Sequence, residues 1–566
     1  MTQLTWSTAC PDWADRLKAG QSIIPPPIFP EQAAHALSIF KELRVVDLPG
    51  KPTFGECSEQ WVFDFVAAVF GGYDAETGKQ MIREYGLLIS KKNTKSTIAA
   101  GVMLTALILC WREDEEHLIL APTKEVADNS FKPAAGMVRA DPELSALFHT
   151  QDHIRTITHR VTKASLKVVA ADTDTVSGKK SGRILLDELW LMGKQPKAEA
   201  MLMEATGGQV SRDEGWVIYL TTQSDDPPAG VFKEKLNYWR DVRDGNIHDP
   251  KTLGILYEFP TEMIESKAYL QPENFYITNP NIGRSVSAEW LADNLRKNQT
   301  KTDGAFQQFL AKHLNIEIGL NLRSDRWPGA DFWLQQATER GLTLAQLIDR
   351  SEVIDIGIDG GGLDDLLGLS VVGRDKESGN WLLWTRAWAH PSVMERHKGT
   401  APRLLDFARD GDLILVKNIG DDVADVAQIV YEVEASGLLD KVGVDPSGLG
   451  SILDAILEAG TPEDKIIGIS QGWKMTGAIR TTERKLAEGQ LVHGGQAMMA
   501  WCVSNAKIEP RGNAILITKQ GSGAAKIDPL LSTFNAITLM SMNPEGRCFD
   551  SFLSNPLTLG GNPRYP

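Results

Sequence analysis

The sequence predicts an α/β fold with two sheets, the first parallel and the second mixed. Three features of the 566-residue chain point to it. An apolar strand-like run at 85–89 is followed by a short polar loop and an apolar helix-like run at 98–111. Two further apolar runs, 183–186 and 216–220, end in polar residues, as strands do at the carboxyl edge of a parallel sheet. Around residue 350 the pattern restarts with a strand, a glycine turn and a hairpin.

The loop after the first strand carries residue types that bind phosphate. A strand, a polar loop and a helix opening with Lys-Ser place backbone N–H groups, a helix N-terminus and an ammonium around one anion. We expect Lys95 to reach the β- and γ-phosphates of a nucleotide and Ser96 to hold Mg²⁺. The standard spacing has glycine at the positions of Ile89 and Thr94, so an ordinary polar turn explains the loop alone about equally well. The predicted nucleotide-binding residues are Lys91, Lys92, Asn93, Thr94, Lys95, Ser96 and Thr97.

Two adjacent acids, Asp187 and Glu188, end the strand at 183–186. In a P-loop ATPase the first acid orders the Mg²⁺ shell, and a neighbouring carboxylate positions or deprotonates the attacking water. Asp187 fits the first role and Glu188 the second. A solvated strand end is the simpler interpretation of either acid alone, but the phosphate loop upstream favours catalysis. Thr222, after the strand at 216–220, is a candidate γ-phosphate sensor, although a polar strand end is the simpler interpretation of that segment alone.

A second set of acids follows in the restarted pattern. Asp359 and Asp445 each end an apolar strand, and Asp528 opens an apolar helix that runs to about residue 540. Three carboxylates from two strand ends and one helix start can converge at one edge of a mixed sheet and bind two hard divalent cations. Such a pair of cations cleaves phosphodiesters. Each aspartate alone is more typical of a cap or turn, so only the set predicts a metal site.

Composition excludes several classes of protein. The formal charge of −15 has the wrong sign for binding nucleic acid over the whole surface, so such binding must be local. The window 465–526 has nine basic residues against three acidic ones and is the candidate phosphate-binding face. The five scattered cysteines form no C-x-x-C pair, which favours a reducing compartment and argues against structural zinc. No signal pattern or membrane-length apolar stretch occurs, so we expect a soluble protein that is not exported.

At this point the motifs resemble the large terminase subunits of tailed double-stranded DNA phages and prophages. The segment 91–96 resembles the family's degenerate phosphate loop, with Thr94 in place of glycine, and threonine tolerates a positive φ poorly. Gln60, before Trp61, resembles the residue that reads adenine. In the second half, Asp359 with Asp364-Asp365 resembles the family's first acidic motif. Further likenesses lie at 121–127, 185–189, 221–223, 444–445, 489–505 and 526–530.

The resemblance implies a packaging ATPase of the P-loop (ASCE) type with a parallel sheet, followed by a nuclease of the ribonuclease H-like type with a mixed sheet. We therefore divide the chain into an N-terminal cap (1–50), the ATPase (51–250), a connecting region (251–345), the nuclease (346–545) and a mobile tail (546–566). The cofactors implied are ATP with Mg²⁺, for which Mn²⁺ could substitute, and two divalent cations at the nuclease site.

The same resemblance implies translocation of double-stranded DNA into a capsid and cutting of concatemers. Its partners would be DNA, a small terminase subunit, the portal of the procapsid and further copies in a ring, expected to be a pentamer. The protein would act in the host cytoplasm, docked transiently on the portal, and be absent from the mature virion. A trans-acting arginine finger is implied, with Arg155, Arg160 and Arg183 as unseparated candidates. Two alternatives remain: a defence or repair ATPase-nuclease, or a decayed prophage subunit that binds DNA or a portal structurally.

Overall fold

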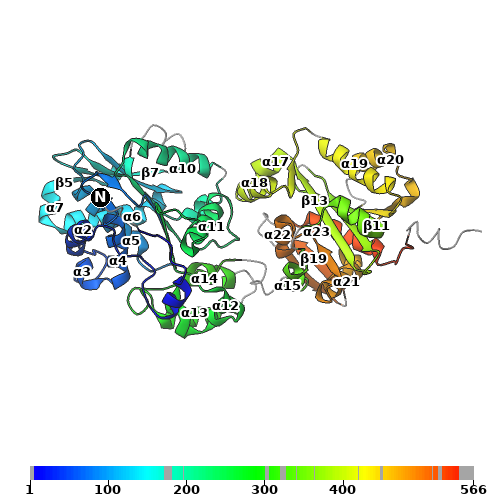
Figure 1. Cartoon of the computed structure of the whole chain (residues 1–566), viewed down its shortest axis with the longest axis horizontal. Coiled ribbons are helices and arrows are strands. Elements are labelled where there is room, and N and C mark those ends of the chain that lie inside the picture. The colour runs from blue at the N-terminus through cyan, green and yellow to red at the C-terminus, as the bar shows by residue number, and fades with distance from the viewer. Residues whose placement is uncertain are drawn as a thin grey trace, which may run out of the picture. The chain divides into compact units, whose positions relative to one another are not determined.

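The computed structural model describes residues 6–170, 181–195, 197–299, 305–318, 327–338, 341–362, 364–418, 420–445, 450–512, 514–519 and 526–546. The chain forms two compact units, residues 1–318 and 319–566 (Figure 1). Each is an α/β unit built around one large sheet. The tail expected at 546–566 lies almost wholly outside the described residues.

The sheet of the first unit has eight strands, of which the first six in spatial order run parallel. Each of the last two strands runs antiparallel to the strand before it. In spatial order they are β10 (Thr252–Leu256), β3 (Glu84–Leu88), β9 (Trp216–Thr221), β8 (Ser181–Leu186), β4 (Glu116–Ala121), β7 (Ser165–Ala170), β6 (Thr156–His159) and β5 (Phe148–Gln151). The expected parallel sheet is therefore present, and its central strands are the ones that end in the candidate site residues.

Helices cover both faces of this sheet (Figure 1). Leu118, Leu120 and Leu186 share a core with α9, α10 and α11 on one face, and α5 and α6 pack on the other. Since both faces are covered, the strands are buried along nearly their whole length. The helices are α1 (Trp13–Lys18), α2 (Pro30–Glu42), α3 (Phe54–Cys57), α4 (Gln60–Phe70), α5 (Lys95–Ile108), α6 (Lys124–Ala140), α7 (Pro142–Leu147), α9 (Leu189–Met192), α10 (Ala198–Gly207), α11 (Gly230–Asp244), α12 (Thr261–Glu265), α13 (Ala288–Gln299) and α14 (Ala305–Leu314), beside a small hairpin of β1 (Tyr73–Asp74) and β2 (Lys79–Gln80).

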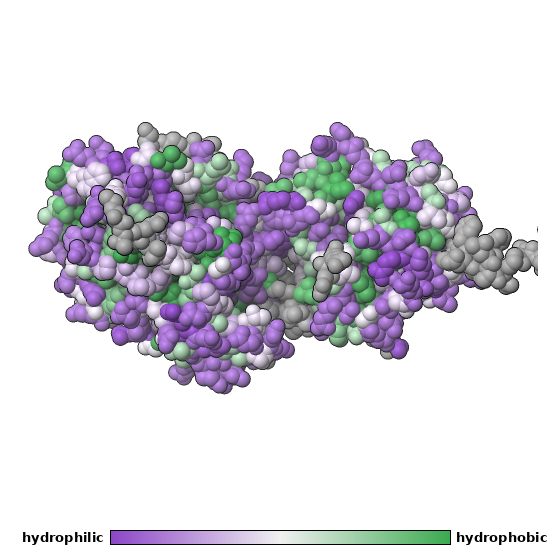
Figure 2. Space-filling model, in the orientation of Figure 1, coloured by the Kyte–Doolittle hydropathy of each residue, from purple (hydrophilic) through white to green (hydrophobic). Residues whose placement is uncertain are grey.

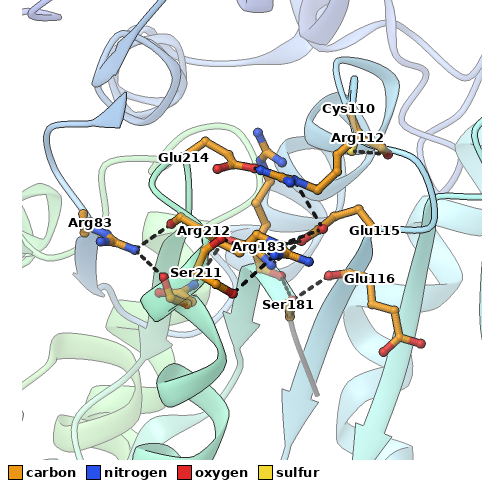
Figure 3. A network of polar contacts seen from close by, with 12 residues as sticks. Arg83, Cys110, Arg112, Glu115, Glu116, Ser181, Arg183, Ser211, Arg212 and Glu214 are labelled. Atoms are coloured by element: carbon orange, nitrogen blue, oxygen red, sulfur yellow. Dashed lines mark hydrogen bonds and ion pairs between the residues drawn. The ribbon is translucent and has the colours of Figure 1, made fainter. Parts of the chain in front are cut away.

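The amino ends of the central strands are tied together by buried charges (Figure 3). Glu115 accepts hydrogen bonds from the Gly182 amide (2.7 Å) and the Arg212 guanidinium (2.9 Å), while Glu214 pairs with Arg112 (2.7 Å). Both glutamates are almost fully buried, so their charges are stable only because guanidinium and amide groups surround them. This network fixes the strands at the edge opposite to their carboxyl ends.

The second unit has a mixed sheet. Strands β11 (Ser351–Gly360), β12 (Leu367–Asp375) and β13 (Trp381–Ala389) are antiparallel neighbours, as the hairpin pattern predicts. Strand β15 (Leu439–Val444) runs parallel to β11. The remaining strands are β14 (Leu413–Leu415), β16 (Ile466–Gly468), β17 (Leu491–His493) and a separate hairpin of β18 (Ala506–Arg511) and β19 (Ala514–Lys519).

Two apolar cores lie on the two faces of this mixed sheet. The helices are α15 (Ala330–Trp333), α16 (Leu344–Arg350), α17 (Pro391–Arg396), α18 (Ala401–Arg409), α19 (Asp421–Ala435), α20 (Gly450–Glu458), α21 (Thr476–Ala487), α22 (Ala497–Asn505) and α23 (Asp528–Met540). Helix α23 lies across β11 and β12 at unusually short range. A Cβ on Gly357 would stand 2.0 Å from the Ser532 carbonyl oxygen, and one on Gly368 would stand 2.7 Å from Pro529 Cα. These two glycines therefore bring Asp528, the first residue of α23, close to the end of β11.

The face shown in Figure 2 is mainly hydrophilic, and its hydrophobic residues form small separate groups. In the part of the chain that the structure describes, no helix combines the length and apolar character that crossing a bilayer requires.

Candidate nucleotide site and candidate metal site

The predicted phosphate loop joins β3 to α5, and the helix begins at Lys95. Thr94 precedes it in the left-handed region, with φ 58° and ψ 20°, and Lys92 also has a positive φ of 73°. Thr94 thus adopts the backbone conformation that glycine takes most easily. The poor tolerance of threonine for this region is a cost that neighbouring contacts must offset.

The two helix-opening residues meet the two acids at the end of β8. Lys95 Nζ lies 2.7 Å from a carboxylate oxygen of Glu188, and Ser96 Oγ donates a 2.8 Å hydrogen bond to Asp187. Ser130 of α6, which the sequence did not single out, donates a second hydrogen bond to Asp187 (3.2 Å). The parallel order β3-β9-β8 brings these groups together because it places the carboxyl ends of the strands at one edge.

Burial and charge set the protonation of this cluster. Burial lowers the pKa of Lys95, but the charges of Glu188 and Asp187 outweigh it, so that the pKa of Lys95 is raised. Burial alone would raise the pKa of Glu188, but the Lys95 ammonium lowers it. Burial raises the pKa of Asp187 despite Lys95. Glu188 is accordingly held as a carboxylate, the form that accepts a proton.

The other loop residues lie around the same turn. Asn93 is buried and donates to the Ser90 carbonyl oxygen (3.0 Å). The Lys91 amide donates to the Lys312 carbonyl oxygen (2.8 Å), and Thr97 lies in the first turn of α5. Thr222 is fully buried just beyond the end of β9, the strand between β3 and β8.

The three aspartates of the second unit line one cavity of about 460 Å³. Asp359 lies at the end of β11, Asp445 follows the parallel neighbour β15, and Asp528 is the first residue of α23. Glycines 360–362 form part of the same wall. A Cβ on Gly360 would stand 2.0 Å from the Leu366 carbonyl oxygen, so this turn, with φ 88°, requires glycine.

The cavity suits a hard divalent cation by its donor chemistry, since its acidic lining consists of carboxylate oxygens. Among the described residues, however, no three His, Cys, Asp or Glu side chains stand close enough together to ligate an ion. The aspartates share a cavity without forming a closed ligand cage.

Asp364 and Asp365 of the neighbouring turn are engaged by cations of the protein. Lys526, itself buried, pairs with Asp365 (2.8 Å) and donates to the Asp364 carbonyl oxygen (2.7 Å). The Asp364 carboxylate lies near His397 (3.2 Å) and Arg396 (3.5 Å). The sequence does not distinguish metal ligands from turn formers at these two positions, and a metal-binding role for either acid stays a prediction.

Comparison with known proteins assigns the family. Residues 61–241 match the family described as "Terminase large subunit, ATPase domain". The chain is 22% identical over 496 residues to the terminase large subunit of Lactococcus phage p2, a match that covers 85% of this chain and 86% of that relative. Residues 61–241 thus match the ATPase domain of large terminase subunits, and the chain as a whole is similar to a terminase large subunit. It therefore contains a terminase ATPase domain, and the resemblance expected from the motifs is confirmed.

Solved structures of large terminases are similar to this chain. That of bacteriophage HK97 has 19% identity and a TM-score of 0.46, covering 90% of this chain and 99% of the other. That of a thermophilic bacteriophage, in complex with ADP, has 13% identity and a TM-score of 0.30, covering 81% and 94%.

Gln60, predicted to read adenine, is the first residue of α4 and donates to Asp64 (2.8 Å) on its own helix. Its neighbour Trp61 instead contacts the phosphate-loop network, because Trp61 Nε1 donates to Asn281 (2.8 Å). Whether Gln60 binds adenine stays a prediction.

Four residues around the loop were not predicted from the sequence: Ser130, Asn279, Asn281 and Lys312. Lys312 Nζ donates to the Gln223 carbonyl oxygen (2.8 Å) and lies over the Trp190 ring. Burial lowers the pKa of Lys312 to about 7. The Asn279-Pro280-Asn281 triplet is a visible polar signal in the sequence, whereas nothing marks Lys312 within its helix.

Proposed function

We propose that this large terminase subunit hydrolyses ATP to drive double-stranded DNA into a capsid and cuts concatemeric DNA with a metal-dependent endonuclease. The observation that carries this proposal is the occurrence in one chain of two sites. One is the Lys95–Glu188 and Ser96–Asp187 cluster at a parallel sheet edge. The other is the cavity lined by three aspartates.

In the ATPase site, Lys95 would neutralise the β- and γ-phosphates, and Ser96 with Asp187 would hold Mg²⁺. Residues Lys91, Lys92, Asn93, Thr94 and Thr97 would surround the phosphates, Gln60 would read adenine, and Thr222 would report the γ-phosphate to the sheet. The large terminase of a thermophilic bacteriophage has been solved with ADP and with ATP-γ-S. For this chain, the support for a nucleotide comes from its own cluster of Lys95, Ser96 and the two acids.

Glu188 would act as the general base. Its carboxylate contacts Lys95 and accepts from the Trp190 indole, so its position is fixed from two sides. When phosphate oxygens take over Lys95, Glu188 would be released to orient the attacking water and take its proton. Binding of the correct nucleotide would thereby switch on the base that hydrolyses it.

In the nuclease site, Asp359, Asp445 and Asp528 would hold two divalent cations. When bound, the cations would supply a hydroxide nucleophile at neutral pH and stabilise the leaving oxygen. The aspartates themselves would bind and orient the cations, and the ion pair of buried Lys526 with Asp365 holds the turn beside them. The large terminase nuclease of phage G20c has been solved with bound magnesium. In this chain, the carboxylate lining of the cavity is what supports such an ion.

The partners we propose are a small terminase subunit, the procapsid portal and further copies of this chain in a pentameric ring, acting in the host cytoplasm. For the trans-acting finger we favour Arg155 or Arg160, because Arg183 lies inside the network at the opposite sheet edge (Figure 3). The domain limits we propose are cap 1–50, ATPase 51–250, connecting region 251–345, nuclease 346–545 and tail 546–566.

The purified chain tests both activities with paired variants. Lys95→Ala should abolish DNA-stimulated ATP hydrolysis and leave Mn²⁺-dependent plasmid nicking intact, whereas Asp359→Asn should do the reverse. Each variant is the folding control of the other. Wild-type turnover in Lys95→Ala would refute the ATPase assignment. Binding to a portal ring distinguishes packaging from a DNA-tracking repair or defence enzyme, and a chain without either activity would be a decayed subunit.

A further inference from the structure

The phosphate loop holds a threonine in a conformation that favours glycine. The hydrogen bond that this threonine makes within the loop does not explain why the conformation is stable. Thr94 has φ 58°, a region that non-glycine residues occupy only when surrounding contacts determine it. Within the loop, its hydroxyl contacts the Asn93 carbonyl oxygen (2.7 Å), which belongs to the adjacent residue and does not fix the turn. Asn93 Nδ2 also donates to the Ser90 carbonyl oxygen within the loop (3.0 Å), and the further contacts to Asn93 and Thr94 come from another part of the chain.

Asn281 supplies them. Its Nδ2 group donates to the Asn93 carbonyl oxygen and to Thr94 Oγ1, both at 3.0 Å. Its backbone N–H donates to Asn93 Oδ1, also at 3.0 Å. The side-chain oxygen of Asn281, Oδ1, accepts a hydrogen bond from Trp61 Nε1 at 2.8 Å. Asn281 is almost fully buried, so all of its side-chain hydrogen-bonding groups are committed to the loop and to the helix that follows Glu59.

Residues on both sides of Asn281 contact the same loop. Asn93 Nδ2 donates to Asn279 Oδ1 (2.9 Å), Ser285 Oγ donates to the Lys92 carbonyl oxygen (2.7 Å), and the Ser90 amide approaches the Thr278 carbonyl oxygen (3.4 Å). The contacts are spread along the loop between β3 and α5, and all of them come from the segment 278–285. This segment lies in the same compact unit as the loop, and Asn281 is 188 residues beyond Asn93.

We propose that Asn281 is a positioning residue for ATP hydrolysis. Its side-chain hydrogen bonds hold Thr94 in the backbone conformation that a glycine at this position would adopt without them. The segment 278–285, which we call the loop clamp, holds the phosphate loop in its anion-binding shape and links it to Trp61. The inference rests on the proposed nucleotide site. It adds that the geometry of this site is set from outside the P-loop motif.

A double-mutant cycle on the full-length chain tests the proposal, with binding of Mg²⁺-ATP-γ-S measured by calorimetry. Asn281→Ala should weaken binding about tenfold, because buried acceptors of the loop lose their donor. Thr94→Gly alone should change binding less than about threefold, since it removes both the backbone strain and one partner of Asn281. In the Asn281→Ala background, Thr94→Gly should restore binding to within about threefold of wild type, because glycine needs no clamp.

The rescue separates positioning from a general structural role. A loss of folding by Asn281→Ala would not be repaired by changing one residue of the phosphate loop. Asn294→Ala is the matched control, because the Asn294 side chain donates within its own helix α13 (2.9 Å to the Trp290 carbonyl oxygen), and it should bind as wild type does. Wild-type binding by Asn281→Ala, or additive losses in the double variant, would overturn the proposal.

Two further results keep the test decisive. If Asn281→Ala does not fold, Ser285→Ala removes one donor of the clamp at an exposed position and should weaken binding about threefold; unchanged binding would count against the clamp. If the wild-type chain binds nucleotide no better than Lys95→Ala, the nucleotide site itself is wrong. A failure of the clamp alone leaves wild-type binding and its dependence on Lys95 intact.

Discussion

At the scale of single residues, the chemistry depends on charges that the fold has buried in pairs. Lys95 and Glu188 are both largely buried and hold one another ionised. Lys312 is buried beside them without a carboxylate at salt-bridge distance among the described contacts, and its pKa falls to about 7. The same environment thus keeps one lysine charged and brings the other close to neutrality, because only the first has a contacting anion.

Glu188→Gln should retain binding of Mg²⁺-ATP-γ-S and lose at least about a hundredfold in the rate of ATP hydrolysis, because the amide keeps the shape but cannot accept a proton. Binding calorimetry and steady-state hydrolysis measure the two effects separately. Glu84→Gln is the control, since Glu84 also contacts a lysine and a tryptophan indole, Lys235 and Trp239, but at the start of β3, the opposite end of that strand from the loop. A hydrolysis rate within a few fold of wild type would exclude Glu188 as the base.

The lowered pKa of Lys312 predicts how stability depends on pH. Between about pH 7, its folded value, and its ordinary value of 10.5, the folded state holds Lys312 neutral while the unfolded state binds a proton. Unfolding therefore takes up a proton, and stability contributed at this site rises with pH over that window. The melting temperature of the wild type minus that of Lys312→Met should therefore increase from about pH 7 to about pH 10. A constant difference in thermal unfolding scans would contradict the shift.

At the scale of elements, both candidate sites are made by the ends of adjacent strands and by helices that begin there. Helix α5 begins at Lys95 after β3, and β8 ends at the two acids. In the second unit, α23 brings Asp528 to the end of β11 because Gly357 and Gly368 leave room for its backbone. The close approach of a helix to a sheet is therefore part of the metal site.

Gly357→Ala should displace α23 and separate Asp528 from Asp359, since the new Cβ would stand 2.0 Å from the Ser532 carbonyl oxygen. Overpacking of this kind costs about 1–3 kcal/mol. We expect a lower urea midpoint for the transition of the second unit and a strong loss of Mn²⁺-dependent nicking, with ATP hydrolysis unchanged. Gly477→Ala is the control, because a Cβ there meets nothing within 4 Å. Full nicking by Gly357→Ala would show that the position of α23 is not critical.

At the scale of the whole molecule, the two candidate sites lie in two compact units that divide after Ile318. All of the contacts described around the phosphate loop, including the loop clamp and Lys312, lie before this point. The nucleotide site therefore does not need the second unit for its geometry.

A fragment of residues 1–318 should bind Mg²⁺-ATP-γ-S within about threefold of the full chain and show no nicking. A fragment ending at residue 250, the predicted limit of the ATPase, should bind far more weakly, because it lacks Asn279, Asn281 and Lys312. Calorimetry on both fragments, with circular dichroism to verify folding, measures the difference. Equal binding by two folded fragments would contradict the role assigned to the loop clamp.

The sequence by itself determined the class of fold, the strands that carry the candidate residues and the acids at their ends. These features depend on apolar runs and on the residue types next to them, which neighbours a few positions apart specify. The strands at 183–186 and 441–444 and the helix from Asp528 to Met540 occur as predicted. The family also follows from this local information, because its motifs are short and ordered.

Only the tertiary structure decided which groups complete the two sites. Asn281 meets Thr94 across 187 residues, and Lys312 meets the Gln223 carbonyl oxygen across 89. Lys526 pairs with Asp365 across 161 residues. Contacts of this kind depend on how helices and loops pack on the sheet, and the periodicity of the sequence does not predict them. The physical reason is that a buried hydrogen bond is specified by its surroundings in space, whereas a strand end is specified by its neighbours in sequence.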